Sequence, residues 1–381
     1  MGGVDVGGGL AVDLHFDGLQ IADAAFGQKR LKGGVKARRS PDAAVDGKGE
    51  LRRRQGKGQK HRQSLRPDSA CGEGAGADQP GMAAGHGDGA GGLQWRDGTA
   101  IVGAMKTLLS LGHGYSAAAL ARRLLPQGWG VIGTTRSPEK AGALRAAGVE
   151  PLLWPGDLAP ALARASHILT SAGPDAAGDP FLRAVPAIAA AGAQWVGYLS
   201  TTAVYGDHQG GWVDEDTALT PASERGRWRV LAEAQWQATG LPVEVFRLAG
   251  IYGPGRGPFE KVRNGSARRI LKPGQVFSRI HVDDIAQVLE ASIRHPHPGA
   301  VYNVCDDDPA PPEDVLSEAA RLLGLPEPPA VDFDRADLTP MARSFYAESK
   351  RVRNDRIKRI LGVTLLYPDF RRGLAALLEE E

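Results

Sequence analysis

Short apolar runs alternate with longer stretches of helical periodicity from residue 106 onward. The pattern predicts strands over residues 107–112, 129–135, 149–154, 166–173 and 194–201, and a later strand that runs into a loop over 241–253. It predicts amphipathic helices over residues 115–128 and 137–148. Strands that alternate with such helices indicate βαβ units. Right-handed crossovers then predict an α/β protein with a doubly wound parallel sheet, whose ligand crevice lies at the carboxyl ends of the strands.

Composition divides the chain near residue 105. The first 104 residues hold 24 of the 51 glycines, together with a basic stretch over 28–66. Such a segment buries too little apolar surface to offset the chain entropy. We therefore expect residues 1–104 to be a disordered low-complexity segment and residues 105–381 to form the folded domain. Beyond about residue 250, frequent proline and glycine predict a small C-terminal substrate lobe.

Two further interpretations of residues 1–104 stay open. The natural protein starts at Met105 in one of them, because the pattern of a folded protein begins there at once. In the other, the basic stretch is an arm that binds a polyanion. We favour a solvated tail over such an arm.

The rest of the composition is that of an ordinary globular protein. A net charge of +2 demands no nucleic-acid partner. Cys71 and Cys305 form no metal or redox spacing. No apolar run is long enough to span a bilayer, and the N-terminus lacks the apolar core of a signal peptide. We expect a cytoplasmic protein with a small-molecule substrate, without nucleic-acid or membrane partners, and with a homodimer as an open alternative.

Residues 112–117 read GHGYSA and stand between the first expected strand and the first expected helix. They fit G-x-G-x-x-A, a pattern that holds the pyrophosphate of a dinucleotide at a helix N-terminus. The first glycine permits the tight turn, the second lets the phosphates approach, and the small third residue lets helix and strand pack closely. The expected cofactor contacts in this loop are Gly112, Gly114, Tyr115, Ser116 and Ala117.

The second expected strand ends at Thr135, and Arg136 follows it. An NAD site usually places an acidic residue here to bind the ribose hydroxyls. Arginine suits a 2′-phosphate instead, because its planar fork pairs with two oxygens. The sequence therefore predicts NADP(H) rather than NAD(H), with an exposed surface arginine as the alternative.

Several later motifs resemble the extended short-chain dehydrogenase/reductase proteins, a Rossmann-fold group that includes nucleotide-sugar epimerases and dehydratases. The resemblance covers residues 105–381 and rests on Asp157-Leu158, Ser171-Ala172-Gly173-Pro174, the segment 199–206, the segment 247–255 and Ile280-His281-Val282-Asp283-Asp284. It implies cofactor contacts at Asp157, Leu158, Ser171, Ala172 and Pro174, and a lobe anchored by His281.

One departure from the family pattern affects the chemistry. The family carries a Tyr-x-x-x-Lys pair on the helix after residue 201, and the matching positions here are Arg225 and Arg229. Arginine stays protonated, so neither residue can replace the tyrosine as acid/base. Arg229 could instead hold the ribose, and Arg225 an anionic substrate. This pattern resembles the atypical subgroup, which keeps the glycine motif but lacks the tyrosine.

Three other side chains near the expected site carry hydroxyl or imidazole groups. Thr201 could donate a hydrogen bond to a substrate, or be tied to the backbone at a strand end. Tyr205 is a candidate replacement acid, although packing is the favoured interpretation, and His208 in the same loop is expected to be exposed. The leading hypothesis is an NADP(H)-dependent oxidoreductase or epimerase acting on a sugar nucleotide or a similar polar hydroxy/carbonyl compound. The alternatives are a non-catalytic NADP(H) sensor or scaffold and, least favoured, a nucleic-acid-binding protein.

Overall fold

The computed structural model describes residues 94–96, 99–101 and 105–381. Within the first 104 residues it describes one antiparallel pair, β1 (Gln94–Arg96) with β2 (Thr99–Ile101), which the sequence pattern does not predict. The expectations of disorder, of a basic arm and of a start at Met105 otherwise lie outside the described residues.

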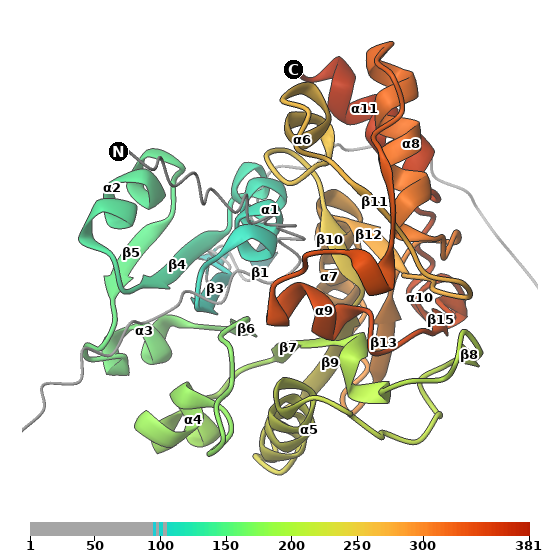
Figure 1. The fold of residues 1–381 in the computed structure, drawn as a ribbon. Helices are drawn as coiled ribbons and strands as arrows, with labels where there is room; N and C mark the ends of the chain where they lie inside the picture. The colour runs from blue at the N-terminus through green and yellow to red at the C-terminus, as the bar shows by residue number, and fades with distance from the viewer. Residues whose placement is uncertain (1–93, 97–98, 102–104) are drawn as a thin grey trace, which may run out of the picture. The chain divides into compact units, whose positions relative to one another are not determined.

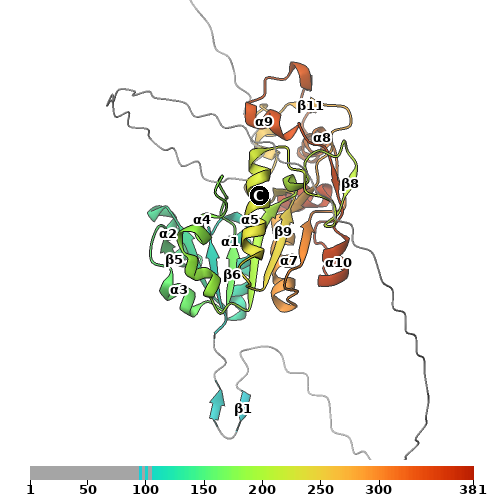
Figure 2. The same cartoon turned by 90° about the horizontal axis from the view of Figure 1, so that it is seen from below.

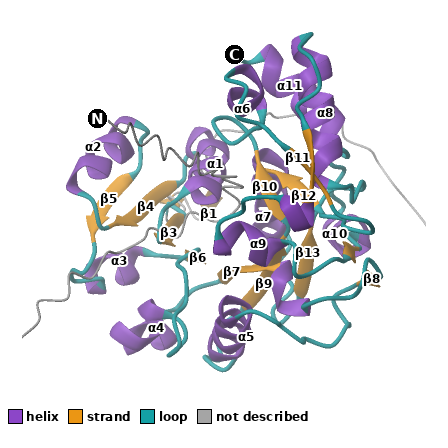
Figure 3. Ribbon diagram, viewed as in Figure 1, coloured by secondary structure: helices purple, strands orange, loops and turns teal. Residues whose placement is uncertain are grey.

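A seven-stranded parallel sheet forms the centre of the described fold (Figures 1 and 3). Its strands, from one edge to the other, are β13 (Val301–Val304), β9 (Val243–Leu248), β7 (Trp195–Thr201), β6 (His167–Thr170), β3 (Thr107–Leu111), β4 (Gly130–Thr135) and β5 (Glu150–Leu153). The chain builds outward from β3 to β5 and then restarts at β6 on the other side of β3. This confirms the predicted doubly wound Rossmann sheet and places its switch point between β3 and β6.

Helices cover both faces of the sheet, because successive strand residues point to opposite faces. Leu108 packs in one apolar cluster and its neighbour Leu109 in the other. The first cluster draws on α1 (Tyr115–Leu124), α2 (Pro138–Ala146), α7 (Val282–Arg294) and α10 (Asp355–Leu361). The second draws on α3 (Ala159–Arg164), α4 (Pro180–Ala184) and α5 (Glu224–Gln237). Figure 1 shows these two groups on opposite sides of the strands.

The remaining C-terminal elements form a lobe with its own two apolar clusters. They are β10 (Gly250–Tyr252), α6 (Phe259–Arg263), β11 (Arg269–Leu271), β12 (Arg279–His281), α8 (Pro312–Leu323), β14 (Ala330–Asp332), α9 (Pro340–Phe345) and α11 (Phe370–Glu379). A parallel pair of β8 (Trp212–Val213) with β15 (Arg351–Val352) accompanies them. Figure 2 shows β11, α8 and α9 together at one end of the central strands.

Three elements after residue 250, α7, β13 and α10, belong to the central layers rather than to the lobe. Helix α7 packs on α1, and β13 pairs with β9 at the edge of the sheet. The residues after 250 therefore do not form the lobe alone, because part of this segment builds regular elements of the central layers. No helix among the described residues is long and apolar enough to cross a membrane.

Candidate functional site

The loop after β3 has the backbone that its first glycine permits. Gly112 has φ +77°, a left-handed conformation that favours glycine. Its N–H donates to the Thr134 hydroxyl at 2.7 Å, which ties the turn to the end of β4. A Cβ at Gly112 would lie 3.1 Å from the backbone N of Ala172, so the segment after β6 also leaves no room for a side chain.

Gly114, the second glycine, has neither constraint. It caps the N-terminus of α1 with φ −116°, which any residue can adopt. An added Cβ would meet only the Gly112 carbonyl oxygen, at 3.8 Å. Neither backbone strain nor packing therefore explains the glycine. The free space lies at a helix N-terminus, where unpaired N–H groups and the helix dipole attract phosphate, so the loop fits a pyrophosphate.

The rest of the predicted motif fastens α1 in place. Ala117 and Ser116 are buried, and Ala117 packs in the cluster between α1 and the sheet. The Tyr115 hydroxyl donates to the Pro254 carbonyl at 2.9 Å, and the Arg256 guanidinium lies 4.2 Å from the centre of the Tyr115 ring. Arg256 thus brings a cation from the loop after β10 to the phosphate loop. The sequence prediction did not include Arg256, because the two residues are far apart in the chain.

The end of β4 forms the neighbouring part of the site. Arg136 is exposed directly after this strand. His113 lies over the strand, where a Cβ at Gly133 would approach the imidazole ring to 2.9 Å. Burial lowers the pKa of His113 to about 4, so the ring is neutral at physiological pH. His113 was not predicted as a site residue either, since one histidine inside a glycine motif carries no recognisable pattern.

The residues expected after β5 and β6 occupy different surroundings. The Asp157 carboxylate is exposed and accepts the Ala159 N–H at 2.9 Å, whereas the Leu158 side chain is buried in the core. Leu158 could therefore contact a cofactor only through its backbone. Ser171 donates to the Gly112 carbonyl, which joins the ends of β3 and β6 at the switch point. Ala172 lies against Gly112, and half-buried Pro174 follows in the same segment.

Helix α5 places Arg225 and Arg229, the residues expected to match the Tyr-x-x-x-Lys positions of the family, differently. Arg229 is buried and donates to the Leu199 carbonyl at 2.8 Å, the Tyr198 hydroxyl at 3.1 Å and the Ala172 carbonyl at 3.3 Å. It therefore holds the ends of β6 and β7 together. Arg225 lies one turn closer to the helix N-terminus, on the same face, and is exposed.

The two candidate hydroxyl groups near the end of β7, those of Thr201 and Tyr205, both form hydrogen bonds within the protein. The Thr201 oxygen accepts the Ala203 N–H at 3.2 Å. Tyr205 is fully buried, donates to Asn303 Oδ1 at 2.7 Å and accepts from Arg247 at 3.0 Å. Burial raises the pKa of Tyr205 to about 12. Its surroundings favour the packing interpretation over the acid.

A buried ion pair beneath this region was not predicted from the sequence. Arg247 of β9 pairs with Glu233 of α5 at 2.8 Å, and both side chains are about 5% exposed. The Ser200 hydroxyl also donates to Glu233, at 2.5 Å. The pair positions α5 against β7 and β9. The resemblance includes Arg247, but no sequence signal identifies its partner.

His208, in a loop, and His281, at the end of β12, are both placed by contacts within the protein. His208 is half-buried, and its Nε2 lies 3.1 Å from the Tyr205 carbonyl oxygen. His281 caps α7, where its Nδ1 accepts the Asp283 N–H at 3.2 Å. Its ring packs on Tyr367 with the centroids 4.0 Å apart. His281 therefore does anchor the lobe to the central layers.

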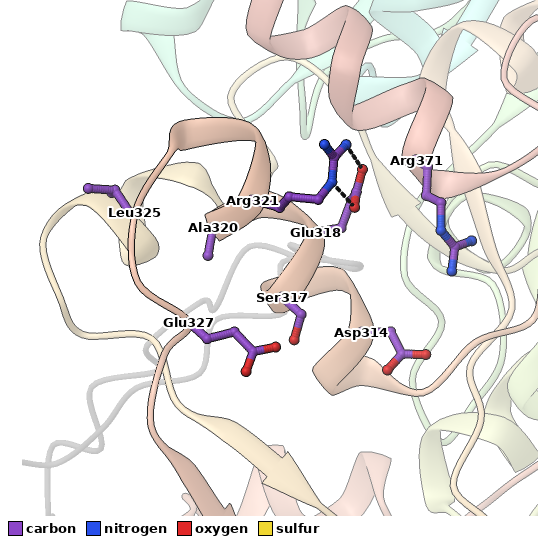
Figure 4. A pocket seen from close by; sticks show the side chains of 8 residues that line it. All are labelled: Asp314, Ser317, Glu318, Ala320, Arg321, Leu325, Glu327 and Arg371. Atoms are coloured by element: carbon purple, nitrogen blue, oxygen red, sulfur yellow. Dashed lines mark hydrogen bonds and ion pairs between the residues drawn. The ribbon is translucent and has the colours of Figure 1, made fainter.

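Figure 4 shows a hollow on the lobe that contains none of the predicted site residues. It is lined by charged side chains of α8 and α11, among them the ion pair Glu318–Arg321 at 2.7 Å. Within the ranges that the structure describes, no cluster of three or more potential metal ligands occurs. The candidate site is thus the carboxyl edge of the sheet, around the phosphate loop, β7 and the start of α5.

The curated proteins that this chain resembles include the following two. Protein YeeZ of Escherichia coli K12 is 30% identical over 286 residues, which are 70% of this chain and 97% of YeeZ. A 3-diazoavenalumate denitrifying reductase from a Streptomyces species is 29% identical over 181 residues, 42% of this chain and 58% of that protein. No family model matches the chain.

Solved structures extend the comparison. A functionally unknown conserved protein from Silicibacter pomeroyi DSS is 66% identical, with 72% of this chain and 99% of that chain covered and a TM-score of 0.71. The UDP-glucuronic acid 4-epimerase of Bacillus cereus, in complex with NAD, has 17% identity, coverages of 72% and 96%, and a TM-score of 0.58. The human epimerase family protein SDR39U1, with NADPH, has 19% identity, coverages of 73% and 100%, and a TM-score of 0.58.

The two cofactor complexes share the fold with this chain at low sequence identity. The match with YeeZ, in contrast, covers nearly the whole length of YeeZ. The seven-stranded parallel sheet with helices on both faces agrees with the fold of these structures. The chain belongs to the family of YeeZ, within the extended short-chain dehydrogenase/reductase superfamily.

Proposed function

We propose that the protein is an NADP(H)-dependent oxidoreductase or epimerase-like enzyme acting on a sugar nucleotide or a similar polar hydroxy/carbonyl compound. The observation that carries the proposal is the open position at Gly114. An added Cβ there would lie 3.8 Å from the Gly112 carbonyl oxygen, an ordinary contact, yet the position holds glycine. Approach of a pyrophosphate to the N-terminus of α1 explains that choice.

The preference for NADP(H) over NAD(H) rests on Arg136. It lies at the end of β4, where the ribose of a bound dinucleotide would be held, and its guanidinium can pair with a 2′-phosphate. Gly112, Tyr115, Ser171 and Ala172 shape the phosphate loop beside it. Both kinds of cofactor occur among the structures that share this fold, NAD in one and NADPH in another.

The residues of this chain supply a hydrogen-bond donor, and no acid/base at the two arginine positions of α5. A bound nicotinamide supplies or accepts the hydride, and the protein binds, orients and stabilises the reacting groups. The Thr201 hydroxyl uses its oxygen to accept the Ala203 N–H. The hydrogen of the same hydroxyl can then donate to a substrate oxygen. Arg225 and Arg229 cannot take up a proton. The proton of the reaction is therefore exchanged with solvent, in reduction and in oxidation alike, because the two directions share one path.

The alternative is a non-catalytic NADP(H) sensor. It is favoured by the same two arginines and by the Tyr205 hydroxyl, which is enclosed by Asn303 and Arg247. A sensor would bind NADP(H) with the same loop and show no turnover with any carbonyl compound.

Fluorescence titration of NADPH and NADH against wild type and Arg136→Gln tests the proposal. We expect tighter NADPH binding by wild type, and a loss of about 1.5–3 kcal/mol for NADPH alone in the variant, since charged hydrogen bonds are removed. Equal weakening of both cofactors, or preference of wild type for NADH, would contradict the phosphate role. Substrate-dependent NADPH oxidation then separates enzyme from sensor.

A further inference from the structure

Helix α9 presents apolar side chains on two faces. Ala342 and Tyr346 are buried in a lobe cluster, where the Tyr346 ring packs on Phe277 at 5.7 Å. Met341 and Phe345 are one helical turn apart on another face and are 49% and 42% exposed. Large apolar side chains at this spacing lie beside each other and form a small apolar patch on the helix surface.

The patch lies beside the start of α5. Nη1 of Arg225 is 4.0 Å from Sδ of Met341, so α9 of the lobe reaches the helix that carries the altered catalytic pair (Figure 1). Arg229, one turn along α5, holds the ends of β6 and β7. Arg225 is on the same face as Arg229, one turn nearer the helix N-terminus. Arg225 and Met341 therefore flank the space beyond the carboxyl ends of these strands.

Arg225 also lacks a charge partner in the described part of the chain. Its only described contact is the Met341 thioether, and no carboxylate forms an ion pair with it there. Some exposed arginines of the fold do pair, such as Arg183 with Asp175 at 2.7 Å and Arg164 with Glu150 at 2.6 Å, whereas Arg227 on the same helix donates only to the Ala222 carbonyl, at 3.0 Å. The site thus combines a cation that is ready for a planar anion with an apolar surface at contact distance.

We propose that Arg225, Met341 and Phe345 form the substrate subsite, and that the substrate is a hydroxy or carbonyl compound with a carboxylate attached to an aromatic body. This inference rests on the proposed function and names its substrate class. The guanidinium fork pairs with both carboxylate oxygens. The apolar body lies on Phe345 and on the Met341 thioether, a favourable partner for aromatic rings.

Three hydroxy compounds separate the two parts of the subsite: 4-(hydroxymethyl)benzoate has both features, 4-methylbenzyl alcohol only the ring, and 4-hydroxybutanoate only the carboxylate. Each is titrated by calorimetry into the full chain with NADPH, which forms a complex that cannot react with an alcohol. We expect the benzoate to bind at least about tenfold more tightly than either partial probe. UDP-glucose serves as the fully polar comparison.

Variants assign the effect to residues. Arg225→Gln should weaken binding of the benzoate about tenfold, with Arg225→Lys intermediate. Met341→Gln with Phe345→Gln should weaken binding of the benzoate about tenfold and leave 4-hydroxybutanoate unchanged. The matched controls Arg227→Gln, on the same helix, and Leu366→Gln, an equally exposed apolar residue, should change neither affinity.

The outcomes distinguish this inference from the proposed function. Absence of NADPH binding overturns the proposed function, and the probes are then titrated against the free protein, where the same ranking still supports the subsite. The inference is overturned if the benzoate does not bind at millimolar concentration or binds no better than the partial probes. It is also overturned if the Arg225 and α9 variants behave like their controls, or if UDP-glucose binds most tightly and ignores the α9 substitutions.

Discussion

At the scale of single residues, the buried histidine His167 makes the stability of the fold sensitive to acid. His167 at the start of β6 is 3% exposed, and its ring packs against Trp129 with the centroids 4.7 Å apart. Its Nδ1 lies 2.9 Å from the Ser166 hydroxyl oxygen. Burial, assisted by the nearby charge of Lys106, lowers the pKa of His167 from 6.5 to about 4. The folded protein therefore keeps this ring neutral over a range in which the unfolded chain protonates it.

The direction of the pH effect follows from proton binding. Between pH 6.5 and 4 the unfolded chain binds more protons at His167, so its contribution to stability is complete above pH 6.5 and is lost as the pH falls toward 4. We predict that wild type loses about 1–2 kcal/mol from this residue between pH 7.5 and 5. Urea unfolding of His167→Phe should show a correspondingly smaller loss, and parallel pH curves for the two proteins would refute the assignment.

Arg229 shows how a residue can be identified from sequence while its role is not. Its position on α5 follows from the resemblance. Its backbone acceptors, Leu199 and Ala172, however lie 30 and 57 positions away from it along the chain. Only the folded sheet brings the ends of β6 and β7 to the same guanidinium. A sequence motif therefore predicts the helix and the position, and cannot predict that the arginine is tied to backbone carbonyls.

Removing this guanidinium should destabilise the fold. Arg229→Ala leaves the Leu199 and Ala172 carbonyls without their donor, and we predict a loss of about 2–4 kcal/mol in the free energy of unfolding. The exposed Arg227→Ala on the same helix is the control and should stay within about 0.5 kcal/mol of wild type. If both variants unfold alike in urea, Arg229 does not hold the strand ends.

At the scale of elements, the loop between β3 and α1 contains one glycine that the backbone and packing require, Gly112, and one that they do not, Gly114. Gly112→Ala forces an L-residue to φ +77° and presses its Cβ against Ala172. We predict a loss of about 1–3 kcal/mol in the free energy of unfolding. Gly114→Ala meets neither obstacle and should fold with nearly unchanged stability. Thermal or urea unfolding of the two variants checks the contrast, and equal destabilisation would contradict it.

The elements before residue 250 were largely predictable, because each is a local pattern. Strands β3, β4, β6 and β7 are apolar runs, and the glycine loop lies directly between β3 and α1. The later elements were less predictable. Helix α7 and β13 return to the central layers after the chain has entered the lobe, and their partners α1 and β9 come from distant segments. Short lobe elements such as α9 carry too few residues for a clear period.

At the scale of the whole molecule, the described core lies within residues 105–381. All buried apolar residues of the described fold, from Leu108 to Leu377, belong to that range. We therefore predict that a fragment 105–381 unfolds at the same midpoint as the full chain. Differential scanning calorimetry of the two proteins checks this. A clear loss of stability in the fragment would show that residues before 105 contribute to the fold.

The central claim is that the carboxyl edge of the sheet binds NADP(H) through the loop at Gly114. Titration of NADPH against wild type and Gly114→Val, with urea unfolding of both, tests it most directly. The valine side chain would occupy the open space at the N-terminus of α1. We predict that wild type binds NADPH, and that the variant keeps its free energy of unfolding but loses NADPH binding. A folded Gly114→Val protein that binds NADPH as tightly as wild type would contradict the claim.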